Sequence, residues 1–431
     1  MRLRPGLIGN YRSDAAVFRS TTQRVWFVVL LTLVIYLGLG GRFLFLHLSK
    51  DLMFLAVSAL FAAIAAIGLN IVTGMAGQIS LGHAFFLGLG AYTAAALGGV
   101  EKIDSVTGEV TLIGLGLDMI IWVPAAGLVA ALAGLLVAPV ATRVRGLYLA
   151  FVTLGLVFLG EHLFKELEMI TGGAGRGRET AVPSLFGFRF DEPGTVLGIH
   201  LSAEQKWYFL GLGLLMVFGI AAKNLARSRV GRAMAAVRDR DIAAEIMGIP
   251  LARYKTIAFV VSSFYAGVAG ALLYGVIGFL EPAKFGFGLS IEYIAMVLIG
   301  GIATVSGSIM GALFIVFLPR GVEHLAGIEG LILPIFGGLL ITVGAALFTA
   351  GAAGWRQRRF NLAAALVAGG GLLLLSLLVS DSAAGGVLTI EQFERILFGV
   401  FIIGFLIFEP LGLYGIWIRI RNYWKAWPFS Y

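Results

Sequence analysis

Five polar side chains interrupt an apolar, glycine-rich segment at residues 68–99, which reads GLNIVTGMAGQISLGHAFFLGLGAYTAAALGG. Amides, hydroxyls and an imidazole can hydrogen-bond to neighbouring helices, or they can line a path for a polar solute. Both interpretations stay open from the residues alone. The candidates for lining a translocation path are Asn70, Thr73, Gln78, Ser80 and His83.

Ser80 and His83 also suggest a nucleophile and its base, because residues three apart share a helix face. Such a pair needs a third, orienting group, and GQISLG is not the Gly-x-Ser-x-Gly turn of hydrolases. The 431 residues include no cysteine, which excludes thiol catalysis, disulfides, zinc–thiolate sites and iron–sulfur sites. They also contain no Gly-x-x-x-x-Gly-Lys-Ser/Thr phosphate loop. We therefore predict no catalytic residue, no metal site and no cofactor in this chain.

The composition is that of a protein embedded in a bilayer. Hydrophobic residues make up 59% of the chain and charged residues 13%, with a mean hydropathy of +0.94. Ordinary globular domains carry about a quarter charged residues. The apolar runs are continuous for about 20 residues, which suits membrane helices and not the short alternating segments of a β-barrel. The expected fold is an all-α polytopic membrane protein.

The apolar runs define about 10–12 expected transmembrane helices. The count is a range because one pair of runs is short and is split by GGIATVSGS, so that it could form two short helices or a re-entrant pair. The runs lie near residues 25–45, 52–70, 80–98, 119–141, 146–163, 206–222, 256–279, 290–302, 308–320, 330–351, 361–380 and 395–414.

Basic residues gather in alternate loops. Of the 32 Lys and Arg residues, 21 lie in the two terminal tails and in residues 142–145, 223–255 and 356–359. The positive-inside rule places these segments, and with them both termini, in the cytoplasm. The net charge of +8 then reflects the orientation of the chain in the membrane, so nucleic acid is not an expected partner. The basic N-terminal tail lacks the early apolar core of a signal peptide.

Glycine gives residues 68–99 two further properties. Gly74 and Gly77 should break the span, which is tolerated only where protein or a water-filled cavity surrounds the backbone. Small residues then recur every four positions, at Gly90, Ala94 and Gly98. The helix that carries them is expected to pack tightly against its neighbours.

The long cytoplasmic loop at residues 223–255 has the pattern of short amphipathic helices. Ile242, Ile246 and Ile249 recur at spacings of four and three, which predicts an apolar stripe. Such a helix could lie in the headgroup region or present a knob to a cytoplasmic partner. The helix breaks are expected at Gly231, Gly248 and Pro250.

Within this loop, AAEIMG at 243–248 resembles the coupling-helix signature of ABC importer permeases, where Glu-Ala-Ala is followed after three residues by Gly. Ile242 stands at the Glu position, a departure that is usual in the branched-chain amino acid permeases. Three other segments are similar to the LivM-type subunits of that branch, in the same order along the chain. They are LNIVTGMAGQISLGHAFFLGLGAYTAAAL, GGIATVSGSIMGALFIVFLP and YWKAWPFSY.

The resemblance implies a non-enzymatic permease subunit of an ATP-driven importer for branched-chain amino acids in a bacterial inner membrane. It implies a second homologous permease subunit, two ATP-binding subunits that hold ATP and magnesium, a periplasmic amino-acid-binding protein and the lipid bilayer as partners. It also implies that a groove of the ATPase receives the 223–255 loop. Small residues allow the close approach, isoleucines anchor the loop, and charged residues make it electrostatically complementary to the groove. The implied coupling residues are Gly231, Arg232, Arg238, Arg240, Ile242, Ala243, Ala244, Glu245 and Gly248.

Two stretches depart from the family pattern. After the TGG motif the chain reads AGRGRET instead of an Asp-Gly or Asn-Gly pair, which leaves the role of that outer loop open. Residues 341–390 resemble an inserted helical hairpin with a basic turn. The expected organisation is a cytoplasmic tail at 1–24, a core permease domain at 25–340, the hairpin at 341–390, and a last transmembrane helix and tail at 391–431.

Two other functions remain open from the sequence. The same architecture serves for urea, short amides or other amino acids, and the residues show no decisive charge that would separate these substrates. An ion-coupled secondary carrier is the alternative from a different class. Carboxylates within the membrane would favour a carrier, and the candidates, Glu161 and Glu292, lie near span ends.

Overall fold

The computed structural model describes residues 21–39, 49–103, 110–144, 146–173, 175–196, 199–326 and 411–426, together with residues 399 and 409. This part of the chain is predominantly helical, which confirms the predicted all-α polytopic class. Its helices are α2 (Thr21–Gly38), α3 (Lys50–Asn70), the π-helix η1 (Ile71–Met75), α4 (His83–Gly98), α5 (Met119–Arg143), α6 (Leu147–Glu166), α7 (Glu168–Thr171), α8 (Ala203–Arg227), α9 (Arg229–Asp239), α10 (Asp241–Ile246), α11 (Leu251–Ile277), the 3₁₀-helix η2 (Pro282–Phe285), α12 (Phe287–Gly300), α13 (Val305–Ala326) and α17 (Gly412–Ala426).

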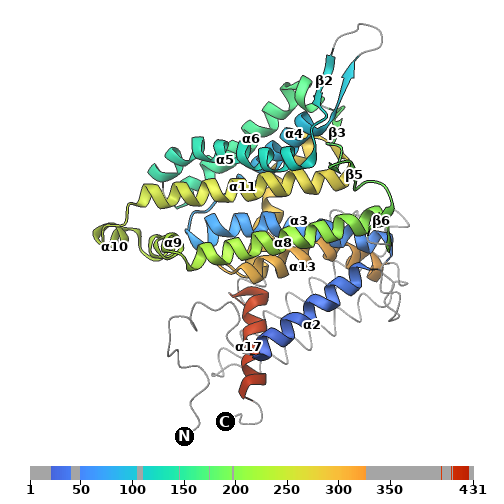
Figure 1. Cartoon of the computed structure of the whole chain (residues 1–431). Coiled ribbons are helices and arrows are strands. Elements are labelled where there is room, and N and C mark those ends of the chain that lie inside the picture. The colour runs from blue at the N-terminus through green and yellow to red at the C-terminus, as the bar shows by residue number, and fades with distance from the viewer. Residues whose placement is uncertain are drawn as a thin grey trace.

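Five of the helical stretches described are long and apolar enough to cross a membrane, and α4, α12 and α13 add shorter apolar helices. The long helices α3, α5, α8 and α11 run side by side, with α9 and α10 at one end and the strands near the other (Figure 1). The expected tail up to residue 20, the hairpin at 341–390 and most of the span at 395–414 lie outside the described residues. The five long stretches are Lys50–Met75, Met119–Arg143, Tyr148–Glu166, Ala203–Arg227 and Leu251–Ile277.

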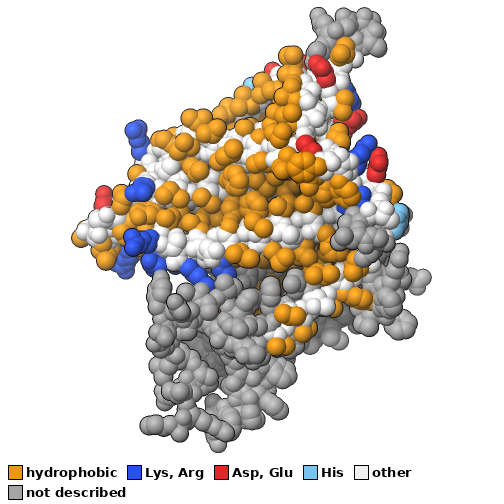
Figure 2. Space-filling view, viewed as in Figure 1, with side chains coloured by type: hydrophobic (Ala, Val, Ile, Leu, Met, Phe, Trp, Pro, Cys, Tyr) orange, Lys and Arg blue, Asp and Glu red, His pale blue; other side chains and the backbone are white. Residues whose placement is uncertain are grey.

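The surface divides into an apolar band and a basic end. Figure 2 shows hydrophobic side chains across the middle of the visible face and Lys and Arg gathered near α9 and α10. Leu132 and Leu136 of α5 are 61% and 80% exposed, a state that suits contact with lipid tails. We call the end that carries residues 223–255 the basic end, and the opposite one, where the strands lie, the strand end.

Helix α11 packs against α3, α4 and α5 in the interior of the bundle. Gly90 of α4 lies against the backbone of Gly267 in α11, and Gly270 of α11 lies against the backbone of Leu87. A side chain at Gly90 or Gly270 would collide with backbone atoms of the opposite helix, and one at Gly267 would collide with the Ala126 carbonyl of α5. The small-residue face predicted on α4 therefore does pack closely, as small residues allow in membrane helices.

The split pair of apolar runs forms two helices, α12 and α13, joined by residues 301–304. Gly300, at the end of α12, lies against the backbone of Gly307 in α13, so the two helices cross at a pair of glycines. The GGIATVSGS motif is thus the connection that brings these helices together. It also faces α3, because both α12 and α13 pack on that helix.

The loops at the strand end form short antiparallel pairs that the sequence did not predict. Arg178, only 2% exposed, donates to the carbonyl oxygens of Ala95 (2.7 Å), Ile113 (3.0 Å) and Ile170 (2.5 Å), and so holds these loops against the end of α4. The pairs are β1 (Val100–Ile103) with β2 (Val110–Leu115), β3 (Arg178–Glu179) with β8 (Phe279–Leu280), β4 (Ser184–Leu185) with β5 (Phe188–Arg189), and β6 (Gly194–Val196) with β7 (Ile199–Leu201).

Candidate functional site

The polar segment begins where the long helix α3 ends. α3 passes directly into the single π-turn η1, and residues 76–82 then continue without regular structure to α4. Gly77 has φ +67°, a conformation that residues with a side chain rarely adopt. The break predicted at Gly74 and Gly77 is therefore present, and π-turns of this kind are frequent at functional sites.

Asn70 ties this break to the connection between α12 and α13. Its side chain is fully buried, its amide nitrogen donates to Ser308 Oγ (2.7 Å) and to the Thr304 carbonyl (2.9 Å), and its amide oxygen accepts from the Ala303 N–H (2.7 Å). All three bonds span more than 230 residues of sequence. Asn70 thus satisfies the polar groups of an irregular turn inside the bundle, which apolar surroundings could not do.

The other four candidates have different partners. His83 lies against Ala65 of α3, with Nε2 3.0 Å from that carbonyl oxygen, and its ring meets Tyr293 edge-on. Ser80 accepts from the Gly82 N–H (3.4 Å), and Gln78 donates to the Ala76 carbonyl (3.3 Å). The buried hydroxyl of Thr73 has no hydrogen-bond partner among the residues described. The surrounding protein encloses this hydroxyl in the structure.

Three hydroxyl residues that hydrogen-bond to this segment were not predicted from the sequence. Thr153 of α6 accepts from the Leu81 N–H (2.8 Å), Ser290 of α12 accepts from the Ala84 N–H (3.1 Å), and Ser308 meets Asn70. All three are buried. In the sequence each of them is a single hydroxyl residue within an apolar run. That pattern does not indicate which group the hydroxyl will bond in the fold.

The loop at 223–255 forms two short helices, but two details of the prediction were wrong. Gly231 lies inside α9 and does not separate helices, because Ser228 ends α8 and caps α9 by accepting from the Gly231 N–H (3.2 Å). Ile249 does not extend the apolar stripe, because α10 already ends at Ile246. The break predicted at Gly248 is present, with φ +81°.

An apolar knob projects from the tip of this loop. Ile242, Ile246 and Met247 are 62%, 83% and 81% exposed, while Ala244 on the opposite face is buried. The remaining predicted coupling residues are exposed around the knob, apart from Gly231, which is buried: Arg232, Arg238, Arg240, Ala243, Glu245 and Gly248. Exposed apolar side chains with a polar rim mark an interaction site.

Arg238 connects α9, the helix that leads into the knob, with the broken helix. It lies in the last turn of α9, its Nη1 donates to the Gly74 carbonyl (3.2 Å), and its side chain and Cα lie over Gly77. Arg238 also pairs with Asp239, Nη2 to Oδ1, at 2.9 Å. A cavity of about 180 Å³ lies beside these groups, between Gly77, Gln78 and the link from α9 to α10. Helix α9, which leads into the knob-bearing α10, thus contacts the polar segment, although the two are far apart in sequence.

Residues 52–406 match the family described as branched-chain amino acid transport system, permease component. The chain belongs to this family. It is 32% identical over 313 residues to the high-affinity branched-chain amino acid transport system permease protein LivM of Escherichia coli (strain K12), a match that covers 70% of this chain and 69% of the relative. LivM of Salmonella typhimurium (strain LT2) is 32% identical over 280 residues, 62% of this chain and 63% of the relative. No solved structure matches the chain.

Membership in the permease family agrees with the long apolar helices of the structure. The chain is a LivM-type permease, a multi-pass inner-membrane protein and a transport subunit. A shorter match, 34% identical over 112 residues, links it to the autoinducer 2 import system permease protein LsrC of Enterobacter sp. (strain 638), of which it covers 32%. Part of this chain is thus similar to a permease named for a different solute.

Proposed function

We propose that this chain is one of two permease subunits of an ABC importer that carries leucine, isoleucine and valine by alternating access, driven by ATP. The observation that carries the proposal is the exposed knob of Ile242, Ile246 and Met247 at the basic end, which follows α9, whose Arg238 donates to the broken helix. A transporter without its own ATP site needs such a surface to receive force. The substrate follows from the LivM-type relatives.

In this scheme two ATPase subunits, which bind ATP and magnesium, close on the knob from the cytoplasm. Arg238 passes the displacement to the carbonyl of Gly74, at the point where α3 is interrupted and therefore bends most readily. Asn70 holds the other side of that break to α12 and α13, so these helices move with it. Alternate exposure of the path to the two sides of the membrane follows from that movement.

The remaining assembly follows the family. A periplasmic binding protein delivers the amino acid at the strand end, and a second homologous permease completes the path. The basic residues of the two tails assign both termini to the cytoplasm, as those near α9 and α10 assign the knob. Selectivity among leucine, other amino acids, urea and short amides then rests largely with the binding protein.

An ion-coupled carrier is the competing function, and one contact argues against it. A carrier needs an intramembrane carboxylate that exchanges a proton or sodium ion. The Glu161 carboxylate, one of the two candidates, accepts from Lys165 Nζ one turn along α6 (2.7 Å), and this ion pair offsets its charge. An ion pair of this kind favours a structural role for Glu161.

Copurification tests the assembly. The tagged chain, extracted from native membranes with a mild detergent, is expected to bring with it a second permease and two ATPase subunits, identified by mass spectrometry. Recovery of the chain alone under conditions that preserve other membrane complexes would contradict the importer and favour the carrier. A variant with Ile246 and Met247 both replaced by serine should lose the ATPase subunits and keep the second permease, because the knob is the proposed ATPase contact.

A further inference from the structure

Four cations gather at the junction of α8 and α9 without an acidic partner. Lys223, Arg227, Arg229 and Arg232 are all exposed there. Residues 205–238 include no Asp or Glu, and none of the four cations forms an ion pair with a residue that the structure describes. A group of positive charges of this kind attracts an anion.

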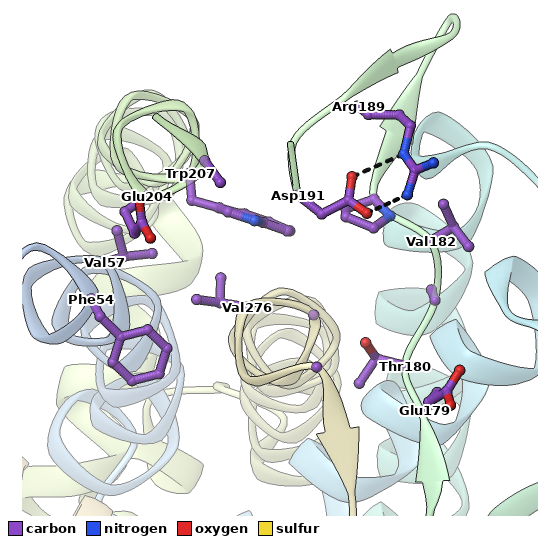
Figure 3. Close-up of a pocket in the computed structure, with 15 residues that line it drawn as sticks. Phe54, Val57, Glu179, Thr180, Val182, Arg189, Asp191, Glu204, Trp207 and Val276 are labelled. Atoms are coloured by element: carbon purple, nitrogen blue, oxygen red, sulfur yellow. Dashed lines mark hydrogen bonds and ion pairs between the residues drawn. The ribbon is translucent and has the colours of Figure 1, made fainter. Parts of the chain in front are cut away.

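The opposite end of the bundle has a different charge balance. A cavity of about 440 Å³ at the strand end is lined by Glu179, Asp191 and Glu204, and Asp191 pairs there with Arg189 (Figure 3). Glu179 also pairs with Lys102. The strand end thus supplies carboxylates to its own cations, whereas the junction of α8 and α9 does not.

Three of the cations at the junction lie close together. Lys223 and Arg227 are four residues apart on α8, so they share one face of the helix and repel each other. Arg232 of α9 lies against the same turn, because its Nη1 donates to the Arg227 carbonyl (2.7 Å). A phosphate group, with several acceptor oxygens and a negative charge, suits this set of donors.

The face of α8 that carries Lys223 and Arg227 is apolar in the preceding turns. Met216 and Ile220 precede them at spacings of four, three and four residues, so the four residues form one stripe. Met216 and Ile220 are 38% and 54% exposed. Among the five long helical stretches described, α8 also has the smallest buried share. The stripe therefore places hydrocarbon next to positive charge, which complements the acyl chain and phosphate of a phospholipid.

The position of these cations favours a lipid over a protein as the partner. Figure 2 shows Lys and Arg side chains gathered near α9 and α10, at the border of the apolar band. Side chains at this border lie level with the phospholipid headgroups when the apolar band is in the bilayer. The knob on α10 provides a separate, apolar surface for a protein.

We propose that Lys223, Arg227 and Arg232 bind the phosphate group of an anionic phospholipid in the leaflet at the basic end. One acyl chain of this lipid lies along the apolar part of the stripe on α8. Arg229 adds to the positive potential that attracts a lipid of net negative charge. The bound phosphate offsets the repulsion between Lys223 and Arg227 and holds the junction of α8 and α9 at the membrane surface. The site does not depend on which solute the chain carries.

Native mass spectrometry of the full-length chain tests the site, with phosphatidylglycerol as the probe and phosphatidylcholine as the zwitterionic comparison. The wild type should retain a first phosphatidylglycerol molecule at a lower lipid concentration than phosphatidylcholine. Replacing both Lys223 and Arg227 by glutamine should weaken binding of that molecule roughly tenfold or more, since each cation near an anionic lipid surface contributes about fivefold in affinity. Binding of phosphatidylcholine should be the same in both proteins.

Two control variants separate the site from net charge and from folding. Arg143→Gln with Arg253→Gln removes two exposed cations from the same end of the bundle, on α5 and α11, and should keep the wild-type affinity. Lys223→Arg with Arg227→Lys keeps both charges on α8 and should also bind as the wild type does. Equal losses in the two glutamine variants would show only general charge attraction and would overturn the site.

Three other results would also overturn the proposal. The first is a wild type that does not prefer phosphatidylglycerol to phosphatidylcholine. The second is wild-type lipid binding in the α8 glutamine variant together with loss of the ATPase subunits on copurification, which would assign these cations to a protein partner. The third is a rise in the thermal unfolding midpoint with millimolar inorganic phosphate that equals the rise with phosphatidylglycerol, because the acyl chain would then play no part.

Discussion

Replacing Gly248 by tryptophan is expected to reduce ATP-driven uptake by roughly thirtyfold or more while the chain still inserts into the membrane. Gly248 lies at the tip of the loop, and a side chain there meets open space in the isolated chain. An indole group would therefore not disturb the bundle but would occupy the groove of the ATPase subunit that receives Ile246 and Met247. Uptake of labelled leucine and the ATPase rate of the assembled importer measure this effect.

Gly248→Ala is the matched control. The residue has φ +81°, so any side chain bears a backbone cost of about 1 kcal/mol, whether it is small or large. The alanine variant carries that cost without the bulk and should keep most of the uptake. Equal amounts of folded protein in the membrane verify that insertion is unaffected. Normal uptake in the tryptophan variant would remove the loop from the mechanism.

Replacing Asn70 by leucine is expected to destabilise the fold by roughly 2–4 kcal/mol. The side chain is fully buried and bridges α3 to residues 303–308 with three hydrogen bonds. Single polar bonds between membrane helices average only ~0.6 kcal/mol. Leucine, however, would also leave the Ala303 N–H buried without a partner, at a cost of ~1–3 kcal/mol. The thermal unfolding midpoint of the purified chain should fall accordingly.

Gln78→Leu provides the comparison for that experiment. Gln78 is also buried, but its amide nitrogen donates a local hydrogen bond, 3.3 Å to the carbonyl of Ala76 two residues away. Its loss should lower the midpoint much less than the loss of Asn70. Equal effects of the two substitutions would show that the bridge from α3 to the connection of α12 and α13 does not stabilise the bundle.

The sequence predicts the spanning helices and the breaks within them because these depend on local composition. Uninterrupted apolar runs gave helices such as α3 and α11, and glycine marked the break at Gly77 and the turn at Gly248. In these places one property, hydrophobicity or backbone freedom, decides the local structure. Gly231 was misread because a glycine can also lie in the first turn of a helix, where the capping Ser228 controls the boundary.

The contacts that join these elements could not be predicted because they link residues far apart in sequence. Arg238 was expected to meet a partner protein, but it donates to Gly74, 164 residues away. The pairing of β3 with β8 likewise joins distant loops, with Arg178 opposite Leu280. A single sequence shows which residues carry hydrogen-bonding groups, but it does not show which distant residues will bond to them in the fold.

Leucine uptake into vesicles that contain the assembled importer tests the central claim most directly. The vesicles would hold this chain, the second permease and the two ATPase subunits, with binding protein outside and ATP inside. We predict uptake that requires ATP hydrolysis and the binding protein and that persists when ionophores abolish proton and sodium gradients. Uptake by this chain alone, driven by an ion gradient and indifferent to ATP, would contradict it.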